Sequence, residues 1–263
     1  MDGLPVEILW MVLRENVDSV DRPACRRVSR LWRQILRCSH EGEHRKAQHY
    51  AETVAWLGRL SALKWARQNG CPLDENTCIA AAGGGYLEML KWARENGCAW
   101  HDHTCAYAAL GGSVDVLQWV IDSGCPRVEN VCAFAASGGH LEVLRWARDN
   151  GHPWDEWICA CAASGGHVHL LQWARANGCP WDARACSNAA QRGHLDTLRW
   201  ARENGCPWDK WTCLYAAMCG RLESLKWARE NGCPWDARDC ADWAMANGHG
   251  AVAEWIALAE KSA

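Results

Sequence analysis

Apolar residues recur along most of the chain with the spacing of short amphipathic helices. In the stretch 141–150, Leu141, Leu144 and Ala147 stand three residues apart, and charged residues occupy the opposite face. This spacing predicts a helix that buries one face. An Asn-Gly pair at 150–151 follows, with Pro153 just beyond it. Such a pair predicts a left-handed cap and the end of the helix at about Asn150.

A second, shorter helix is predicted before it, over residues 130–136, where small side chains allow a neighbouring helix to approach closely. The pair then recurs along the chain. One tryptophan column repeats every 27 residues, at Trp65, Trp92, Trp119, Trp146, Trp173, Trp200 and Trp227. A helix pair of this size cannot cover its own apolar face, so consecutive pairs must stack. We therefore expect an all-α solenoid of helix pairs.

The tryptophan column is expected to form much of the interface between repeats, because aromatic residues at helical spacing are usually core residues. A fully buried indole removes roughly 150–250 Å² from water. On that basis Trp146→Ala is expected to cost about 3–5 kcal/mol and to loosen two repeats. The alternative is that the indoles form a ladder on which a ligand stacks.

The repeat resembles the ankyrin repeat. The resemblance is carried by Thr77-Cys-Ile-Ala-Ala-Ala82, by Gly-x-Leu-Glu-x-Leu-x-Trp and by the terminal Asn96-Gly97. The 27-residue unit is shorter than the 33 residues of an ankyrin repeat. The missing residues correspond to the ankyrin β-hairpin finger, so we expect a short Cys-Pro-Trp-Asp turn there. The resemblance implies a solenoid over residues 51–263, with about seven to eight shortened ankyrin-like repeats and a variant cap as the last.

The N-terminal 40 residues lack this repeat. A helix is predicted over residues 4–13, and a second helix over residues 25–36 has arginines opposite its apolar face. So small a helical domain is marginal alone. Residues 41–50 are expected to be a polar linker.

These N-terminal residues resemble the F-box, through Leu4-Pro-Val-Glu-Ile-Leu9 and Val28-Ser-Arg-Leu-Trp-Arg33. The middle departs from that family at Asp21-Arg-Pro23, which leaves the docking of the second helix open. The resemblance implies that one set of residues serves binding of the adaptor that links F-box proteins to a cullin scaffold, with Trp32 anchoring the domain: Leu4, Pro5, Ile8, Leu9, Val12, Leu13 and Trp32. The alternative is that residues 1–40 only cap the solenoid.

Composition excludes several classes of function. The net charge of −3 argues against nucleic acid as the main partner. No run of 18 apolar residues and no secretion leader are present, so we expect neither a membrane span nor export, and a cytoplasmic location. No arrangement of catalytic residues stands apart from the repeat, so we expect no enzyme and no cofactor.

The chain has 17 cysteines, most of them in two repeat columns. We expect free thiols that act as small buried apolar residues. These columns are Cys71, Cys98, Cys125, Cys179, Cys206 and Cys233, and Cys78, Cys105, Cys132, Cys159, Cys186, Cys213 and Cys240. One spacing resembles a metal site, Cys98-x2-His101-x-His103-x-Cys105, but both cysteines are ordinary column residues. We expect no metal there.

Recognition is expected where the repeat varies. The variable column before the threonine, with the positions after Ala-Ala, corresponds to the concave binding face of ankyrin proteins. The predicted target-binding residues are His103, Trp157, Arg184, Gln191, Arg192, Trp211, Met218 and Arg238. Trp157 and Trp211 lie outside the structural tryptophan columns, and tryptophan and arginine are favoured as binding anchors. The alternative is surface drift without function.

Together the resemblances imply a protein–protein interaction module, expected to be monomeric, that recruits an unknown target protein to a cullin-type (SCF) ubiquitin ligase. Such combinations resemble F-box/ankyrin families of giant DNA viruses of amoebae, which implies a host cytoplasm. One alternative is a non-catalytic binding scaffold whose N-terminal helices only cap it. A metal- or redox-sensing array is another.

Overall fold

The computed structural model describes residues 51–68, 70–126 and 129–261, and every regular element in those ranges is helical. The chain divides after Thr104 into two units. In the first unit residues 51–56 are helical, and three further helices follow. They are α4 (Leu60–Gln68), α5 (Glu75–Gly83) and α6 (Leu87–Glu95). The predicted all-α repeat fold is confirmed.

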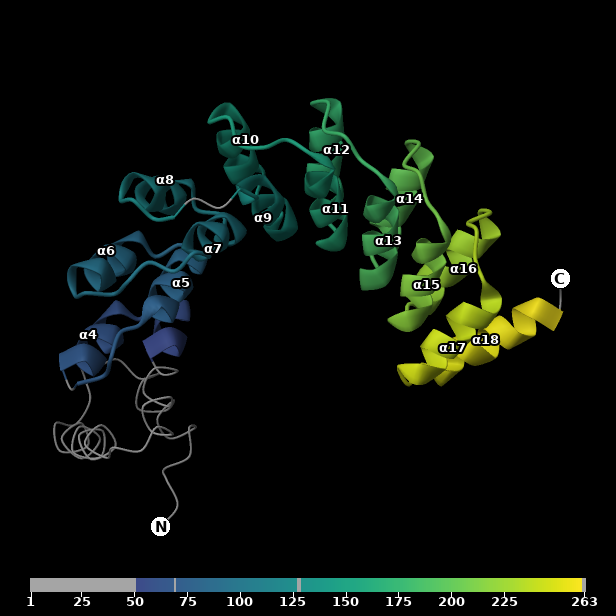
Figure 1. Cartoon of the computed structure of the whole chain (residues 1–263), viewed down its shortest axis with the longest axis horizontal. Coiled ribbons are helices and arrows are strands. Elements are labelled where there is room, and N and C mark those ends of the chain that lie inside the picture. Colours follow the sequence, from purple (N-terminus) through teal and green to yellow (C-terminus); the bar gives the residue numbers. More distant parts are fainter. Residues whose placement is uncertain (1–50, 69, 127–128, 262–263) are drawn as a thin grey trace, which may run out of the picture. The chain divides into compact units, whose positions relative to one another are not determined.

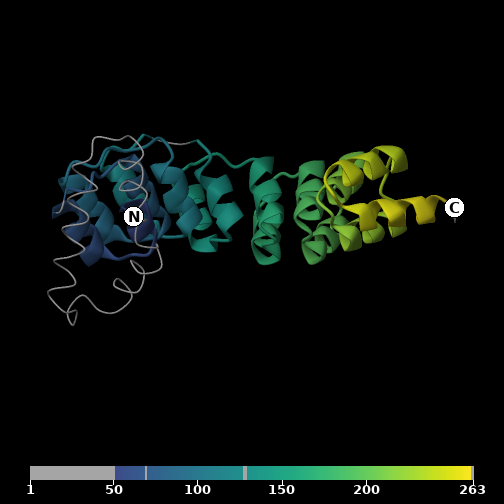
Figure 2. The same ribbon diagram turned by 90° about the horizontal axis from the view of Figure 1, so that it is seen from below.

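The second unit contains the remaining described helices, which follow the same pairing (Figure 1). They are α7 (Thr104–Gly111), α8 (Val114–Asp122), α9 (Val131–Gly138), α10 (Leu141–Asp149), α11 (Glu156–Ser164), α12 (Val168–Ala176), α13 (Ala183–Arg192), α14 (Leu195–Glu203), α15 (Lys210–Met218), α16 (Leu222–Glu230), α17 (Ala237–Ala246) and α18 (Gly250–Lys261). Helix α11 packs between α9 and α13, α13 packs on α15, and α15 packs on α17. The first helices of consecutive repeats therefore form one layer, with their partners α10, α12, α14 and α16 in a second layer (Figures 1 and 2).

The Cys-Pro-Trp-Asp segment is a turn without a strand, as predicted, and its aspartate begins the next helix. The carboxylates of Asp155, Asp182 and Asp209 each accept a hydrogen bond from the backbone N–H two residues later. An aspartate at this position satisfies an otherwise unpaired donor and complements the positive end of the helix. The first helix of each of these repeats therefore starts at a fixed residue.

The second helix of a repeat ends at the predicted asparagine. The Asn150 side chain donates a hydrogen bond of 2.8 Å to the carbonyl oxygen of Trp146, and the next residue, Gly151, has a φ of +75°. The same side-chain cap recurs at Asn177, Asn204 and Asn231. Each of these asparagines therefore closes the last turn of its own helix.

The core consists of alanine, leucine and cysteine. Leu144, Leu171 and Leu198 are completely buried, and all thirteen column cysteines are buried too. The Cys206 thiol donates a hydrogen bond of 3.4 Å to the carbonyl oxygen of Asp182, and the Cys233 thiol donates to the carbonyl oxygen of Asp209 in the same way. The cysteines thus act as small core residues, and four of the first column also tie their turns to the capping aspartate one repeat earlier: Cys98, Cys179, Cys206 and Cys233.

The predicted burial of the tryptophan column is wrong in degree, because all seven indoles are only half-buried. Three of them, Trp173, Trp200 and Trp227, pack against a tryptophan of the turn that precedes their repeat. The ring centroids of Trp154 and Trp173 are 5.8 Å apart in an edge-to-face arrangement, and Trp181 and Trp200 repeat the contact at 6.0 Å. Arginines cover the turn indoles, as Arg175 does 4.2 Å above the Trp181 ring. The result is an Arg–Trp–Trp ladder along α12, α14 and α16. Trp146 itself is only half-buried, so the loss expected for Trp146→Ala falls below the value for a fully buried indole.

A glycine between the two helices of a repeat lies against a histidine ring of the following repeat. Gly139 has a φ of +77°, and a Cβ placed on it would lie 2.6 Å from the imidazole of His167. The Nε2–H of His167 donates to the carbonyl oxygen of Ser137 at 3.0 Å. Close approach and backbone conformation together require glycine at position 139.

Gly139→Ala is expected to destabilise the protein more than Gly151→Ala. Both residues have left-handed backbones, which cost an alanine about 1–2 kcal/mol. Space around Gly151 is open, whereas Gly139 touches His167. Urea denaturation of both variants measures the difference. Equal losses would show that the imidazole contact adds nothing to the backbone strain.

Stability is also expected to fall on acidification because of His167. Partial burial and three neighbouring histidines lower its pKa below the ordinary value, although the hydrogen bond to Ser137 opposes the shift. Below about pH 6.5 the unfolded chain therefore gains protons before the folded chain does, and stability is lost as pH falls through the folded pKa. Urea melts at about pH 7.5 and about pH 5.5 should show a smaller pH effect for His167→Gln than for the wild type. An unchanged pH effect would contradict the assignment to His167.

Candidate protein-binding surface

Three indoles stand out on the first-helix layer of the second unit because they are exposed. Trp157 on α11 is 47% exposed, Trp211 on α15 is 45% exposed and Trp243 on α17 is 50% exposed. Neighbouring residues on the same helices, such as Cys159 and Cys213, are completely buried. Burying an indole stabilises a protein, so an indole left in solvent is available to another molecule.

The capping aspartates set the position of these side chains. Trp157 and Trp211 are both the second residue of their helix, and the N–H of each donates at 3.1 Å to the aspartate that begins it. They lie two repeats apart in the same register. The local rule that starts each helix therefore also places the two indoles at matching ends of α11 and α15.

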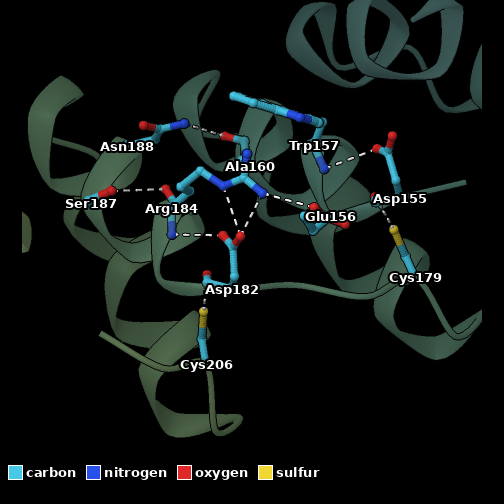
Figure 3. A network of polar contacts seen from close by, with 10 residues as sticks. All are labelled: Asp155, Glu156, Trp157, Ala160, Cys179, Asp182, Arg184, Ser187, Asn188 and Cys206. Atoms are coloured by element: carbon cyan, nitrogen blue, oxygen red, sulfur yellow. Dashed lines mark hydrogen bonds and ion pairs between the residues drawn. The ribbon is translucent and has the colours of Figure 1, made fainter. Parts of the chain in front are cut away.

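Arg184 of α13 bridges to α11 and covers Trp157 (Figure 3). Its guanidinium carbon lies 4.1 Å from the centre of the Trp157 ring. Its Nε donates to Asp182 at 2.8 Å, and a terminal nitrogen donates to Glu156 at 3.0 Å. One cation thus satisfies an aromatic face and two carboxylates.

The electrostatics of this cluster follow from that arrangement. Partial burial pushes the pKa of the Asp182 carboxyl upward, but hydrogen bonds from Arg184 and its charge outweigh burial and leave the pKa below its ordinary range. The same partners raise the pKa of Arg184. Both groups therefore stay charged at neutral pH, and the cation is already engaged within the chain.

The corresponding place between α15 and α17 is an open pocket of about 350 Å³. Its aromatic lining is Trp211, Tyr215 and Trp243, and the rings of Trp211 and Tyr215 are 5.6 Å apart. Carboxylates of Asp236 and Asp239 also line it. The pocket can therefore accept a group that is flat or apolar in part and positively charged.

The structure brings some of the sequence-predicted target-binding residues together and leaves others apart. Arg184 stacks on Trp157, and Met218 lines the same pocket as Trp211. Gln191 and Arg192 lie at the opposite end of α13 from Arg184, and Arg238 is exposed near the start of α17. His103 is exposed and belongs to the first unit.

Sequence reasoning missed Tyr215, Trp243, Asp236 and Asp239 as surface residues. Two of them carried a readable signal. Trp243 belongs to neither tryptophan column, and Asp239 stands where Thr77, Thr104 and Thr212 stand in other repeats. The predicted adaptor-binding residues, Leu4, Pro5, Ile8, Leu9, Val12, Leu13 and Trp32, lie outside the described residues.

The Cys98-x2-His101-x-His103-x-Cys105 spacing is not gathered into a ligand cluster. Cys98 is buried and its thiol contacts the Asp74 carbonyl oxygen and the Cys78 thiol. The His101 Nδ1 accepts a hydrogen bond from the backbone N–H of His103 at 3.0 Å. Among the residues that the structure describes, no group of three or more histidine, cysteine or acidic side chains could hold a metal ion.

No disulfide joins the cysteines in the described ranges. Burial raises the pKa of Cys71 and of Cys132 to about 11 and that of Cys240 to about 12. These three thiols therefore stay protonated at neutral pH, and a protonated thiol is a poor nucleophile. Within the described part of the chain, no helix combines the length and apolar character needed to span a bilayer.

One family model matches part of the repeat array. Residues 132–175 and 185–229 match the family model "Ankyrin repeats (many copies)". No curated protein matches the chain. Among solved structures, the crystal structure of the human ASB11 ankyrin repeat domain is similar at 19% identity and a TM-score of 0.45, over 60% of this chain and 84% of that chain. The family match supports ankyrin repeats from α9 to α16.

Proposed function

We propose that this protein recruits a target protein to a cullin-type ubiquitin ligase, without catalysing a reaction itself. Ankyrin repeats indicate a protein–protein interaction scaffold. The array would bind the target and residues 1–40 would bind the ligase adaptor. Such a role belongs in the cytoplasm, which is a host cytoplasm if the likeness to giant-virus families holds.

The observation that carries the target-binding half is the exposure of Trp157 and Trp211. Both lie on a layer of packed helices, at equivalent positions two repeats apart. Rigid helices present the two indoles with little loss of conformational entropy on binding. Tryptophan is enriched among the few residues that dominate binding energy at protein interfaces.

The ligase half rests on the Leu4-Pro-Val-Glu-Ile-Leu9 and Val28-Ser-Arg-Leu-Trp-Arg33 motifs. An apolar helix face on so small a domain needs a covering partner, and the adaptor of the ligase is the partner that the F-box resemblance implies. If residues 1–40 are only a cap, the chain is a binding scaffold alone.

The experiment is a pull-down of the full chain from host extract, with antibodies against the adaptor and the cullin. The variants are Leu4→Ala/Pro5→Ala and Trp157→Ala/Trp211→Ala. The first pair is expected to lose adaptor and cullin but keep the target. The second pair is expected to keep adaptor and cullin but lose the target.

The outcomes separate the two halves of the proposal. Wild-type protein that retains neither adaptor nor cullin would refute the ligase role and leave a binding scaffold. Adaptor bound equally by wild type and Leu4→Ala/Pro5→Ala would show that the F-box motif is not the docking element. Circular dichroism of each variant is the control that the array is folded.

A further inference from the structure

The α11/α13 and α15/α17 interfaces are two versions of one site. Trp157 corresponds to Trp211, and Asp182 corresponds to Asp236, each two repeats along in the same register. Both tryptophans are exposed and both aspartates cap the next helix. The helices therefore begin at equivalent residues and two of the key side chains are the same at both places. The caps differ in one respect: Asp182 accepts from the N–H two residues later, and Asp236 accepts from the N–H three residues later.

In the first version the chain supplies its own cation. The central carbon of the Arg184 guanidinium lies 4.1 Å from the centre of the Trp157 ring, and the same group bridges Asp182 and Glu156 (Figure 3). Such a group gains from the aromatic face and from two hydrogen-bonded carboxylates at once. This site is filled.

In the second version one substitution changes the outcome. Lys210 replaces Glu156, and its Nζ lies 5.7 Å from the Trp211 ring centre. The carboxylate that holds the far side of Arg184 is thereby replaced by a like charge. Arg238, the counterpart of Arg184, is exposed to solvent.

New groups on α17 complete the second site. Asp239 replaces the small Ala185, and Trp243 lines the pocket together with Trp211 and Tyr215. The lining carries the carboxylates of Asp236 and Asp239 against the single ammonium of Lys210. Asp236 already accepts one hydrogen bond, from the Asp239 N–H at 3.0 Å, and a carboxylate can accept several more. The pocket therefore keeps acceptor capacity and three aromatic rings.

We propose that this pocket binds the guanidinium group of an arginine side chain presented by the target protein, in the way that Arg184 fills the site two repeats earlier. Arginine fits better than lysine because its planar group stacks on a ring and donates a pair of hydrogen bonds to a carboxylate. The inference rests on the proposed target-binding function and specifies the chemistry of its anchor.

The test uses the full chain with ¹⁵N-labelled tryptophan, in which each indole N–H gives one NMR signal. Signals of Trp157, Trp211 and Trp243 are assigned by single replacement with phenylalanine. The probe is Nα-acetyl-arginine methylamide at millimolar concentration, the range expected for a single side chain. The corresponding citrulline derivative has nearly the same shape without the charge, and the lysine derivative has the charge without the plane.

The arginine probe is expected to shift the Trp211 and Trp243 signals to saturation, with weaker binding of the lysine derivative and none of the citrulline derivative. Asp236→Asn/Asp239→Asn is expected to lose about tenfold or more in affinity. Asparagine still caps a helix, so this variant keeps the fold. The Trp157 signal is expected to keep its position when the probe is added to the wild type, and to shift in Arg184→Ala, where the internal cation is gone.

Unmoved Trp211 and Trp243 signals would overturn the inference, and so would equal shifts with the citrulline derivative. The proposed function is judged separately, by target capture. If the target is captured and Asp236→Asn/Asp239→Asn captures it equally well, the surface binds the target but this pocket does not hold an arginine. If the probe binds as expected and no target is captured, the arginine site stands and the recruiting role fails.

Discussion

Replacing Trp157 and Trp211 together by alanine is expected to weaken target binding by about 100-fold or more. Each indole is about half exposed in the free protein and can be covered by a partner. Truncation of a central aromatic anchor commonly costs 2 kcal/mol or more at an interface. Affinity is measured with the protein that co-purifies with the wild-type chain.

A matched pair of indoles separates binding from folding. Trp181 and Trp208 lie in the Arg–Trp–Trp ladder, against Trp200 and Trp227. Trp181→Ala/Trp208→Ala should lower the free energy of unfolding but leave the affinity of the folded protein unchanged. Trp157→Ala/Trp211→Ala should change the free energy of unfolding by about 1 kcal/mol or less. If the ladder variant loses binding and the surface variant does not, the binding face has been assigned to the wrong layer.

Leu198→Ala is expected to cost about 2–5 kcal/mol of folding free energy. Leu198 is completely buried on α14, between the two layers, and its removal leaves a cavity that packed helices cannot close. In a solenoid each repeat depends on its neighbours, so the loss should be concentrated near the site. Urea denaturation gives the total cost, and hydrogen exchange shows which amides open.

Leu195→Ala on the same helix is the control, because Leu195 is only half-buried. It should cost clearly less than Leu198→Ala. Amides of α13 to α16 should lose protection first in Leu198→Ala, whereas those of α9 should change little. Equal costs for the two variants, or a uniform loss of protection along the second unit, would contradict stabilisation by local repeat contacts.

The sequence predicted most of the secondary structure because its signals are local. The helix predicted from Leu141 to about Asn150 is α10, Leu141–Asp149, with Asn150 as its cap. A glycine that must adopt a positive φ, such as Gly151, marks a helix end whatever the rest of the chain does. Burial of the two cysteine columns was predicted for a similar reason, because each column recurs once in nearly every repeat.

The candidate site was predictable only in part. Trp157, Arg184, Trp211 and Met218 were predicted from the sequence because they vary where the frame is constant, and their binding of a target stays a prediction. The stacking of Arg184 on Trp157 was not predicted, because it joins side chains of two repeats. The pocket beside Trp211 was missed for the same reason. Arg238 stands in the same column as Arg184, but the carboxylate that pairs with Arg184, that of Glu156, is replaced by Lys210 on the neighbouring helix. This difference appears only when two columns are compared.

The sequence by itself determined the repeat length, the helix pairs, their ends and the all-α stack, because backbone capping and helical periodicity act within a few residues. Only the tertiary structure decided which indoles are covered. Trp173 is covered by Trp154 of the preceding turn. Trp157, on the first-helix layer, contacts Arg184 but remains about half exposed. The physical reason is that coverage depends on side chains of adjacent repeats, whose contacts form only once the helices have stacked.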